Sequence, residues 1–341
     1  MAKQKVRKRS TQADIAQRAG VSQAMVSYVL NNAADISIPH ETRQRIMGVA
    51  AELGYIPNNN ARSLRTSKSF TIASIIPDIT NPFYPDFQRG VQEVAEHNGY
   101  GLMIYNTDGD EEKEQQALRS ALQTGADGII GVFFHVNARN LRLLLELGVR
   151  IVRLEPAARS GGSYPLDSLF VDNVAAARAA VTYLIERGYR RIGLLTASAG
   201  PGASRMAGYR DALEAHGMAY DPRLVMEGDF MEESGYETMR RLLEQTPRPD
   251  AVFAVNDMMA IGALVAAREA GLAIPQDVAI MGFDDIPVAR LVEPSLSTVT
   301  QFQRRLGQRA AAMLLERLAS SAPQPGRCEE MPFSLILRQS T

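Results

Sequence analysis

Apolar residues recur in two different patterns along the chain, and the change between them falls near residue 70. Before it, they repeat at helical spacing, which predicts short amphipathic helices. After it, uninterrupted apolar runs alternate with longer amphipathic segments, which is typical of parallel strands connected by helices. The sequence therefore predicts a small all-α N-terminal domain followed by a large α/β core.

Residues 11 to 31 predict two helices separated by a tight turn, with Thr11 and Ser22 as N-caps and Gly20 at the end of the first helix. In the second helix, an inward stripe is formed by Met25, Val26, Val29 and Leu30, and an uncharged outer face by Gln23, Ala24, Ser27 and Tyr28. Such a face suits base edges in a major groove, so we interpret the pair as a DNA-binding helix-turn-helix. The alternative is a helical hairpin whose outer face meets only water.

A third helix is predicted over residues 39 to 53, with Pro39 near its start and Gly54 at its end. Pro57 blocks continuation, and residues 61 to 64 could form only a very short helix, which would need a partner to be stable. The predicted domains are a basic tail at 1–10, a helix-turn-helix domain at 11–57, and a hinge helix with linker at 58–69. A flexible basic linker is the alternative for the hinge.

Charge is unevenly divided between the two parts of the chain. Residues 1–68 contain 11 Lys and Arg against 4 Asp and Glu, a net charge of +7. Subtraction from the totals of 37 and 38 leaves 26 basic and 34 acidic residues for 69–341, a net charge of −8. A basic head on an acidic body favours phosphate binding by the N-terminal domain.

The core is predicted to contain two doubly wound lobes, because 272 residues are too many for one such sheet and the strand pattern restarts near residues 168–171. Lobe 1 is expected at about 70–165 with part of 292–320, and lobe 2 at about 166–291 with part of 321–341. Ligands of such sheets bind at the carboxyl ends of the strands. Strand-like runs lie at 71–77, 101–106, 127–133, 150–154, 191–196, 251–255 and 278–283.

Enzyme signatures are missing from the sequence, so we expect no catalytic residue, metal or cofactor. The four histidines are scattered, and residues 200–205 depart from a dinucleotide fingerprint because Arg205 stands in place of its third glycine. The single cysteine, Cys328, excludes an internal disulfide and fits a reducing cytoplasm. No long apolar run or signal peptide is found, so no membrane association is expected. A secreted sugar-binding protein, the alternative function, would carry a signal peptide and lack residues 11–68.

The N-terminal strings DIAQRAGVS, VSYVLNN, ETRQRI, ELGYIPN and ARSLRT resemble those of the lactose-repressor (LacI/GalR) family of bacterial transcription regulators. This resemblance implies a hinge helix that orders on a palindromic operator, with Leu64 wedged between base pairs in the minor groove. It implies DNA contacts at Thr11, Ser22, Gln23, Ala24, Ser27, Tyr28, Asn31, Asn58, Ala61, Arg62, Leu64 and Arg65. The chain departs from the family pattern at Tyr28, in extra residues near 33–40 and in its longer basic tail.

The core strings PDITNPFYPDFQRGV, SRMAGYRDAL, GDFMEESGY, PDAVFAVND and GFDD extend the resemblance. It implies a periplasmic-binding-protein-like core that dimerises and binds a small effector, expected to be a sugar, between the lobes. The implied effector contacts are Phe83, Tyr84, Arg205, Phe230, Asn256 or Asp257, and Asp284. As alternatives, Arg205 and Asp284 form an inter-lobe salt bridge, and Phe83 and Phe230 belong to the core.

The sequence thus predicts a cytoplasmic homodimeric repressor whose affinity for double-stranded operator DNA depends on a small molecule. A ligand that closes the cleft would change the separation of the two hinges in the dimer. The sign of the ligand's effect, the operator sequence and the effector's identity are left open.

Overall fold

The computed structural model describes residues 10–30, 36–55, 68–137, 140–155, 166–320 and 324–341. The chain divides into two compact units, residues 1–69 and residues 70–341. Each unit is described by itself.

Within its described residues, the first unit contains three of the predicted helices, α1 (Gln12–Ala19), α2 (Gln23–Leu30) and α3 (His40–Glu52), whereas the predicted hinge helix lies outside the described residues. Thr11 and Asp14 form a capping box at α1, because the Thr11 hydroxyl accepts from the Asp14 N–H and the Asp14 carboxylate accepts from the Thr11 N–H. Ser22 caps α2 by accepting from the Met25 N–H at 3.2 Å. The core between the helices is built from Ile15, Ala16, Ala19, Val26, Val29, Ile46 and Ala50.

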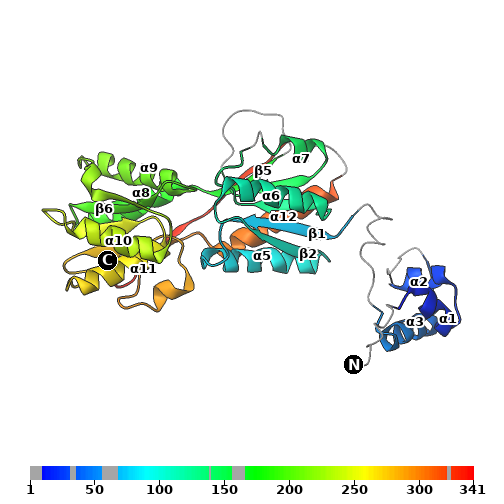
Figure 1. The fold of residues 1–341 in the computed structure, drawn as a ribbon. Coiled ribbons are helices and arrows are strands. Elements are labelled where there is room, and N and C mark those ends of the chain that lie inside the picture. Colours follow the sequence, from blue (N-terminus) through cyan, green and yellow to red (C-terminus); the bar gives the residue numbers. More distant parts are fainter. Residues whose placement is uncertain (1–9, 31–35, 56–67, 138–139, 156–165, 321–323) are drawn as a thin grey trace, which may run out of the picture. The chain divides into compact units, whose positions relative to one another are not determined.

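The second unit consists of two lobes, each with a parallel sheet (Figure 1). The sheet of the first lobe runs in the order β11-β5-β4-β3-β1-β2, and all neighbouring strands are parallel. Its strands are β1 (Thr71–Ile76), β2 (Gly101–Asn106), β3 (Gly128–Gly131), β4 (Arg150–Arg153), β5 (Asp167–Val171) and β11 (Cys328–Met331).

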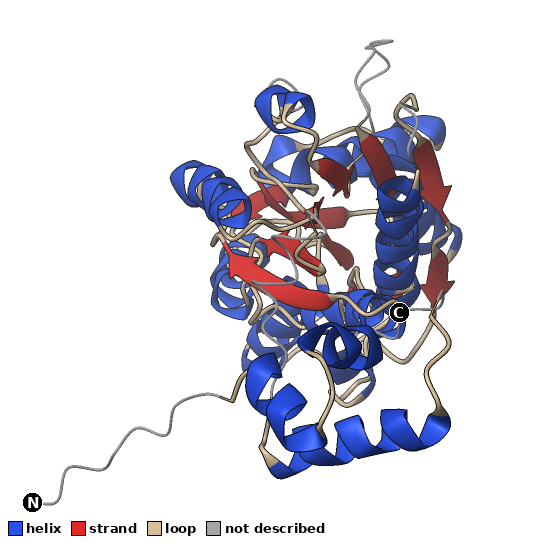
Figure 2. Cartoon of the chain, turned by 90° about the vertical axis from the view of Figure 1, so that its right-hand side faces the viewer, coloured by secondary structure: helices blue, strands red, loops and turns tan. Residues whose placement is uncertain are grey.

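Helices cover both faces of the first lobe's sheet, which is why its strands are apolar on both sides (Figure 2). Ile72 of β1 packs with residues of α5 and α12 on one face, whereas Ala73 and Ile75 pack with α6 and α7 on the other. The helices are α5 (Phe83–His97), α6 (Glu111–Gln123), α7 (Arg142–Glu146) and α12 (Gln303–Ala319).

The second lobe has a four-stranded parallel sheet in the order β7-β6-β8-β9. Its elements are β6 (Ile192–Ala197), β7 (Val225–Gly228), β8 (Ala251–Ala254), β9 (Ala279–Met281), α8 (Asn173–Glu186), α9 (Gly202–Ala215), α10 (Glu232–Leu243), α11 (Asp257–Glu269) and the 3-10 turns Pro222–Leu224 and Pro287–Arg290. An antiparallel pair, β10 (Thr298–Thr300) and β12 (Ser334–Ile336), adjoins β9 through a bridge between Met281 and Ser297. In each sheet the strand order reverses beside the strand that comes first in that lobe, β1 or β6. Ligands of such sheets bind at the carboxyl ends of the strands next to that reversal.

The chain passes between the lobes three times: from β5 to α8, from β10 to α12 and from β11 to β12. Two-lobed doubly wound architecture is confirmed, but the boundary predicted at residue 166 is wrong. Strand β5 pairs with β4 and β11 in the first lobe's sheet, so the second lobe starts after Val171. The pattern of apolar residues in a strand does not by itself indicate which of the two sheets the strand joins.

All seven of the predicted strands form, with ends that differ by at most two residues. The sequence pattern did not single out β7, β10, β11 and β12, and it indicated β5 only as the place near residues 168–171 where the strand pattern restarts. Strands β7, β11 and β12 are short and partly exposed, and β11 carries two glutamates, so they lack a continuous apolar run.

Candidate functional site

A cavity of about 480 Å³ lies between the lobes, at the carboxyl ends of both sheets. Each lobe supplies residues that follow its strands directly, as Asp78 follows β1 and Asp108 follows β2 in the first lobe. In the second lobe, Phe230 follows β7 and Asn256 follows β8. The volume is within the range of small-molecule sites, so the cavity has the position and the size expected of an effector pocket.

Arg205 lies in the first turn of α9 and is almost fully buried, with 4% of its surface exposed. Its Nε donates to Oδ1 of Asn173 at 2.8 Å, Nη1 donates to the Val255 carbonyl oxygen, and the guanidinium lies 3.6 Å from the ring centre of Phe283. Burial lowers the pKa of Arg205, and the nearby Asp284 carboxylate opposes this shift. These contacts fix the guanidinium at the wall of the cavity.

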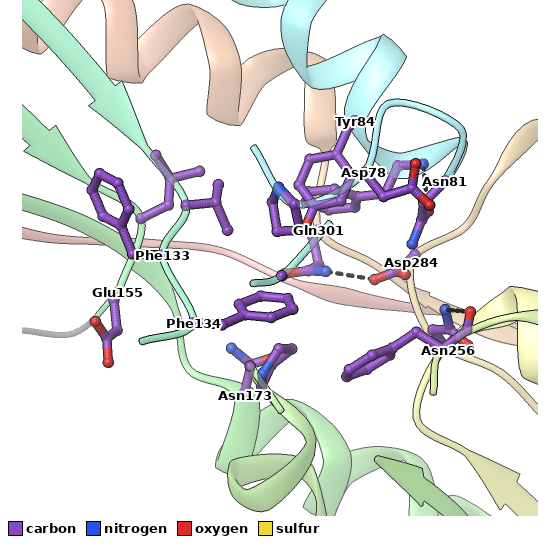
Figure 3. A pocket seen from close by; sticks show the side chains of 18 of the residues that line it. Asp78, Asn81, Tyr84, Phe133, Phe134, Glu155, Asn173, Asn256, Asp284 and Gln301 are labelled. Atoms are coloured by element: carbon purple, nitrogen blue, oxygen red, sulfur yellow. Dashed lines mark hydrogen bonds between the residues drawn. The ribbon is translucent and has the colours of Figure 1, made fainter. Parts of the chain in front are cut away.

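Asp284 lies beside this arginine, with Oδ1 at 3.6 Å from Nη2 of Arg205. The same oxygen accepts a 2.7 Å hydrogen bond from Gln301 (Figure 3). Burial raises the pKa of Asp284 to about 6, although Arg205 and Gln301 both stabilise its charged form. Its backbone has φ 118°, a conformation that residues other than glycine rarely adopt and that is found preferentially at functional sites.

Arg205 and Asp284 both belong to the second lobe, so the alternative of an inter-lobe salt bridge between them is wrong. The ion pair forms part of the cavity wall instead. Both residues line the cavity together with Phe83, Tyr84, Phe230 and Asn256, which the resemblance also implies as effector contacts.

Tyr84 faces the ion pair from the first lobe and is buried (Figure 3). Burial raises the pKa of its hydroxyl above the ordinary value, and the charge of Asp284 adds to the shift. The ring of Phe83 packs edge-on against Tyr84 with centroids 5.1 Å apart. Phe83 and Phe230 each pack partly against an apolar cluster and also line the cavity. Each therefore belongs both to the core and to the cavity wall.

Asn256 caps α11, because its Oδ1 accepts from the Met259 N–H at 2.9 Å. Its Nδ2 donates to the Phe230 carbonyl oxygen at 2.8 Å. This hydrogen bond stabilises the backbone of Phe230, which has the unusual φ of 73°. Asn256 therefore both lines the cavity and orients Phe230.

Asp257 is not among the residues that line the cavity, so the structure does not place it with the other predicted contacts. Its carboxylate accepts from the Ile286 N–H at 2.9 Å and from the Thr298 hydroxyl at 2.5 Å. Burial raises its pKa well above the ordinary value, with Asp284 as the next contribution. These hydrogen bonds tie the loop after β9 and strand β10 to α11. Asp257 lies away from the cavity although its neighbour Asn256 lines it, because adjacent residues at the start of a helix point in different directions.

Several cavity residues were not singled out from the sequence. They are Asp78, Asn81, Asp108, Phe133, Phe134, Glu155, Asn173, Ser204, Asp229 and Gln301. Their position next to the carboxyl end of a strand was the available signal, and it applies to all of them except Ser204 and Asn81.

The cavity lining is acidic. Five carboxylates line it (Asp78, Asp108, Glu155, Asp229 and Asp284), whereas Arg205 is the one Lys or Arg among the described lining residues, a formal balance of −4. This arginine already makes the contacts given above. The balance disfavours an anionic ligand and leaves room for a neutral one.

The outer face of α2 is accessible in the first unit. Ser22, Gln23, Ala24 and Tyr28 are exposed and Ser27 is half-buried, whereas Val26 and Val29 are buried. The exposed N-cap Thr11 lies at the start of α1. The remaining predicted DNA contacts lie outside the described residues: Asn31, Asn58, Ala61, Arg62, Leu64 and Arg65.

Among the described residues, no group of three or more metal-binding side chains occurs, and no helix is long and apolar enough to cross a membrane.

Comparison with known proteins agrees with both parts of the chain. Residues 11–58 match the model of the lacI family of bacterial regulatory proteins, and residues 181–341 match a periplasmic binding protein-like domain. The ribose operon repressor of Escherichia coli (strain K12) is 32% identical over 327 residues, which cover 95% of this chain and 98% of that protein.

Solved structures of other regulators are similar over nearly the whole chain. The complex of the regulator CelR with cellobiose has a TM-score of 0.73 and 30% identity, and covers 98% of this chain and 100% of that one. The lac repressor dimer bound to operator and the anti-inducer ONPF has a TM-score of 0.85 and 25% identity, with 98% and 99% covered. The chain is a DNA-binding transcriptional regulator that belongs to the lacI family.

Proposed function

We propose that the chain represses transcription from a palindromic operator, and that a neutral sugar or sugar derivative in the cavity controls its affinity for DNA. The observation that carries the ligand proposal is the pair Arg205 and Asp284, buried side by side at the wall of a cavity with aromatic rings. A carboxylate and a guanidinium together can accept from and donate to neighbouring hydroxyls, while the aromatic rings stack on the apolar face of a sugar.

The acidic lining supports an uncharged ligand over a phosphorylated one, because a phosphate would meet five carboxylates and a single guanidinium. The names of two similar proteins agree with this class, since one is a ribose operon repressor and the other was solved with cellobiose. We propose direct ligand contacts by Arg205, Asp284, Tyr84, Phe83 and Phe230, with Asn256 in a mainly orienting role.

For DNA recognition, we propose that α2 lies in the major groove with Gln23, Ala24, Ser27 and Tyr28 toward the base edges. Thr11 and Ser22 cap helix N-termini, where backbone N–H groups suit phosphate oxygens. The proposed phosphate and minor-groove contacts of the hinge are Asn58, Ala61, Arg62, Leu64 and Arg65, and Asn31 of the helix-turn-helix domain is a further proposed DNA contact.

We propose a homodimer, in keeping with the lac repressor dimer that the chain resembles. Two copies would place two α2 helices on the two halves of a palindrome. A regulator of chromosomal genes acts where the DNA is, so we propose the cytoplasm as its location. Neither DNA binding nor ligand binding requires a catalytic residue.

The ligand proposal can be tested by thermal shift and titration calorimetry with the full chain. D-ribose, cellobiose and unphosphorylated nucleosides serve as neutral probes, and ribose 5-phosphate serves as the anionic probe. We expect at least one neutral probe to raise the melting temperature, because a ligand bound only by the folded state stabilises it, and we expect no shift with the phosphate. Binding confined to phosphorylated or carboxylated compounds would overturn the proposed class.

The DNA proposal is tested by selection of bound sequences from random duplexes. A palindromic consensus is expected, and the neutral probe that binds should change the affinity for it. Thermodynamic linkage requires the consensus DNA to change the affinity for that probe by the same factor. Failure to enrich any palindrome would contradict the DNA proposal and leave the ligand proposal standing.

A further inference from the structure

The side chain of Phe134 extends from the first lobe into the middle of the cavity (Figure 3). It follows β3, and its ring centre lies 6.3 Å from that of Phe230 in the second lobe. A Cβ built on Gly200 of the second lobe would lie 2.5 Å from the Phe134 ring, which is closer than real contacts allow. The ring therefore packs directly on the backbone of the opposite lobe.

The other edge of the ring lies against the first lobe. A Cβ on Gly109 would be 3.1 Å from Cδ2 of Phe134. The ring is thus held between one glycine of each lobe, and neither glycine could carry a side chain without displacing it. Gly200 has φ 54° and lies two residues before α9, the helix that carries Arg205.

A buried carboxylate fixes the loop that carries this ring. Glu114 of α6 is fully buried and accepts from the backbone N–H groups of Phe134 at 2.6 Å, His135 at 3.1 Å and Val136 at 2.8 Å. His135 Nε2 lies 2.8 Å from the Gly109 carbonyl oxygen and joins the loop to the turn after β2. Hydrogen bonds to an ionised group are strong, so Glu114 holds the loop in one conformation.

We propose that Phe134 is a latch between the two lobes and that Glu114 is its positioning residue. The inference deepens the proposed function, because opening and closing of this cleft is what the effector is proposed to control. A ligand that contacts Arg205 and Asp284 also contacts the Phe134 ring, which lines the same cavity. The ring itself resists separation of the lobes. Removal of the ring favours an open arrangement and lowers the apparent ligand affinity, since a smaller fraction of the protein is competent to bind.

A double-mutant cycle on the full chain, read as melting temperatures, tests the contact without ligand or DNA. Gly200→Ala forces a Cβ into the Phe134 ring, so we expect a large loss that becomes markedly smaller in the Phe134→Ala background. Gly217→Ala is the matched control, because Gly217 also has a positive φ at the other end of α9 but has open space around it. Its loss should be the same in both backgrounds.

Additive effects of Gly200→Ala and Phe134→Ala would overturn the latch. If Phe134→Ala does not fold, Phe134→Leu takes its place in the cycle, because leucine lacks the Cε1 and Cζ atoms that lie closest to Gly200. A failure here would leave the proposed ligand and operator untouched, because neither takes part in the measurement.

Hydrogen exchange separates a latch from mere support of a loop. Glu114→Gln replaces one of the two acceptor oxygens with an amide NH2, which then faces at least one of the three backbone donors, so exchange should rise at residues 134–136. If the loop holds the lobes together, exchange should also rise several-fold in residues 199–206 of the second lobe. Glu112→Gln, the same change at an exposed position of α6, is the control and should leave exchange unchanged at both 134–136 and 199–206. A rise confined to 134–136 in Glu114→Gln would contradict the proposal.

Discussion

The side-chain amide of Gln301 donates a 2.7 Å hydrogen bond to Oδ1 of Asp284 and so joins a segment that crosses between the lobes to the acid of the cavity. Asp284 follows β9 in the second lobe, whereas Gln301 lies two residues before α12 of the first lobe. Gln303, the first residue of α12, also donates to the Asp284 carbonyl oxygen. A ligand that changes the hydrogen bonding of Asp284 therefore acts on a connection between the lobes.

Affinity for a neutral sugar should fall as the pH is lowered through 6. Burial raises the pKa of Asp284 to about 6, and the ionised carboxylate is the better acceptor for ligand hydroxyls. At pH 5 about one-tenth of this carboxyl remains ionised. Calorimetry should then give an affinity about tenfold lower than at pH 7.5.

Asp284→Asn is the control for that affinity profile and should make it flat. An affinity profile that stays steep in Asp284→Asn would assign the pH dependence to another group.

The raised pKa of Asp284 also affects stability. The contribution of this carboxyl to the free energy of unfolding is fully present below its ordinary pKa of 3.8 and is lost as the pH rises through about 6.

Arg205→Ala should abolish the response of operator binding to the effector while the protein still binds DNA. The guanidinium holds Asn173 and pairs with Asp284 at the cavity, far along the chain from α2. Arg210→Ala on the same helix is the matched control, because Arg210 is exposed and stacks on Tyr220 outside the cavity. Gel-shift titrations with and without a binding sugar decide the matter, and a normal response in Arg205→Ala would remove this residue from the site.

Tyr28→Ala should change which operator is preferred. The side chain is 39% exposed on the outer face of α2, and a good base contact contributes about 1 to 3 kcal/mol to discrimination. Tyr28→Phe tells hydrogen bonding from packing, because it keeps the ring and removes the hydroxyl. Unchanged base preference in a selection from random duplexes would show that Tyr28 reads no base.

Leu64→Ala should weaken operator binding more than binding to random DNA. A leucine wedged into a base step stabilises the specific, kinked complex, whereas nonspecific binding depends mainly on phosphate contacts. Titrations of both DNAs at one fixed salt concentration measure the difference. Equal losses on the two DNAs would argue against the wedge.

Asp167→Asn should destabilise the core by about 3 kcal/mol or more, because it leaves two arginines without their buried carboxylate. Asp167 is fully buried in β5 and binds both Arg317 and Arg327. Burial raises the pKa of Asp167, but the hydrogen bonds from the arginines outweigh burial and the net shift is downward. This stabilisation should therefore be present above the ordinary pKa and be lost as the pH falls below it.

Arg142→Ala is the control for the Asp167 variant, because the exposed pair Arg142 and Glu146 within α7 should contribute less than about 1 kcal/mol. Urea denaturation of both variants gives the comparison. Similar midpoints for the two would contradict a central role for Asp167.

The sequence by itself determined the local elements and the family. Helix α1 begins at Thr11 and ends at Gly20 because a capping hydroxyl and a left-handed glycine act over a few residues of chain. The burial of Val26 and Val29, with Tyr28 exposed, follows from helical periodicity in the same way.

Only the tertiary structure decided which distant segments meet. It placed β5 in the first lobe, and it turned Asp257 away from the cavity while its neighbour Asn256 lines it. It also brought Phe134 against Gly200, and Glu114 under the loop that carries that ring. Such contacts join residues that are far apart in sequence, and they depend on how the sheets are ordered and how the lobes face each other. Periodicity and capping are local properties and carry no information about that arrangement.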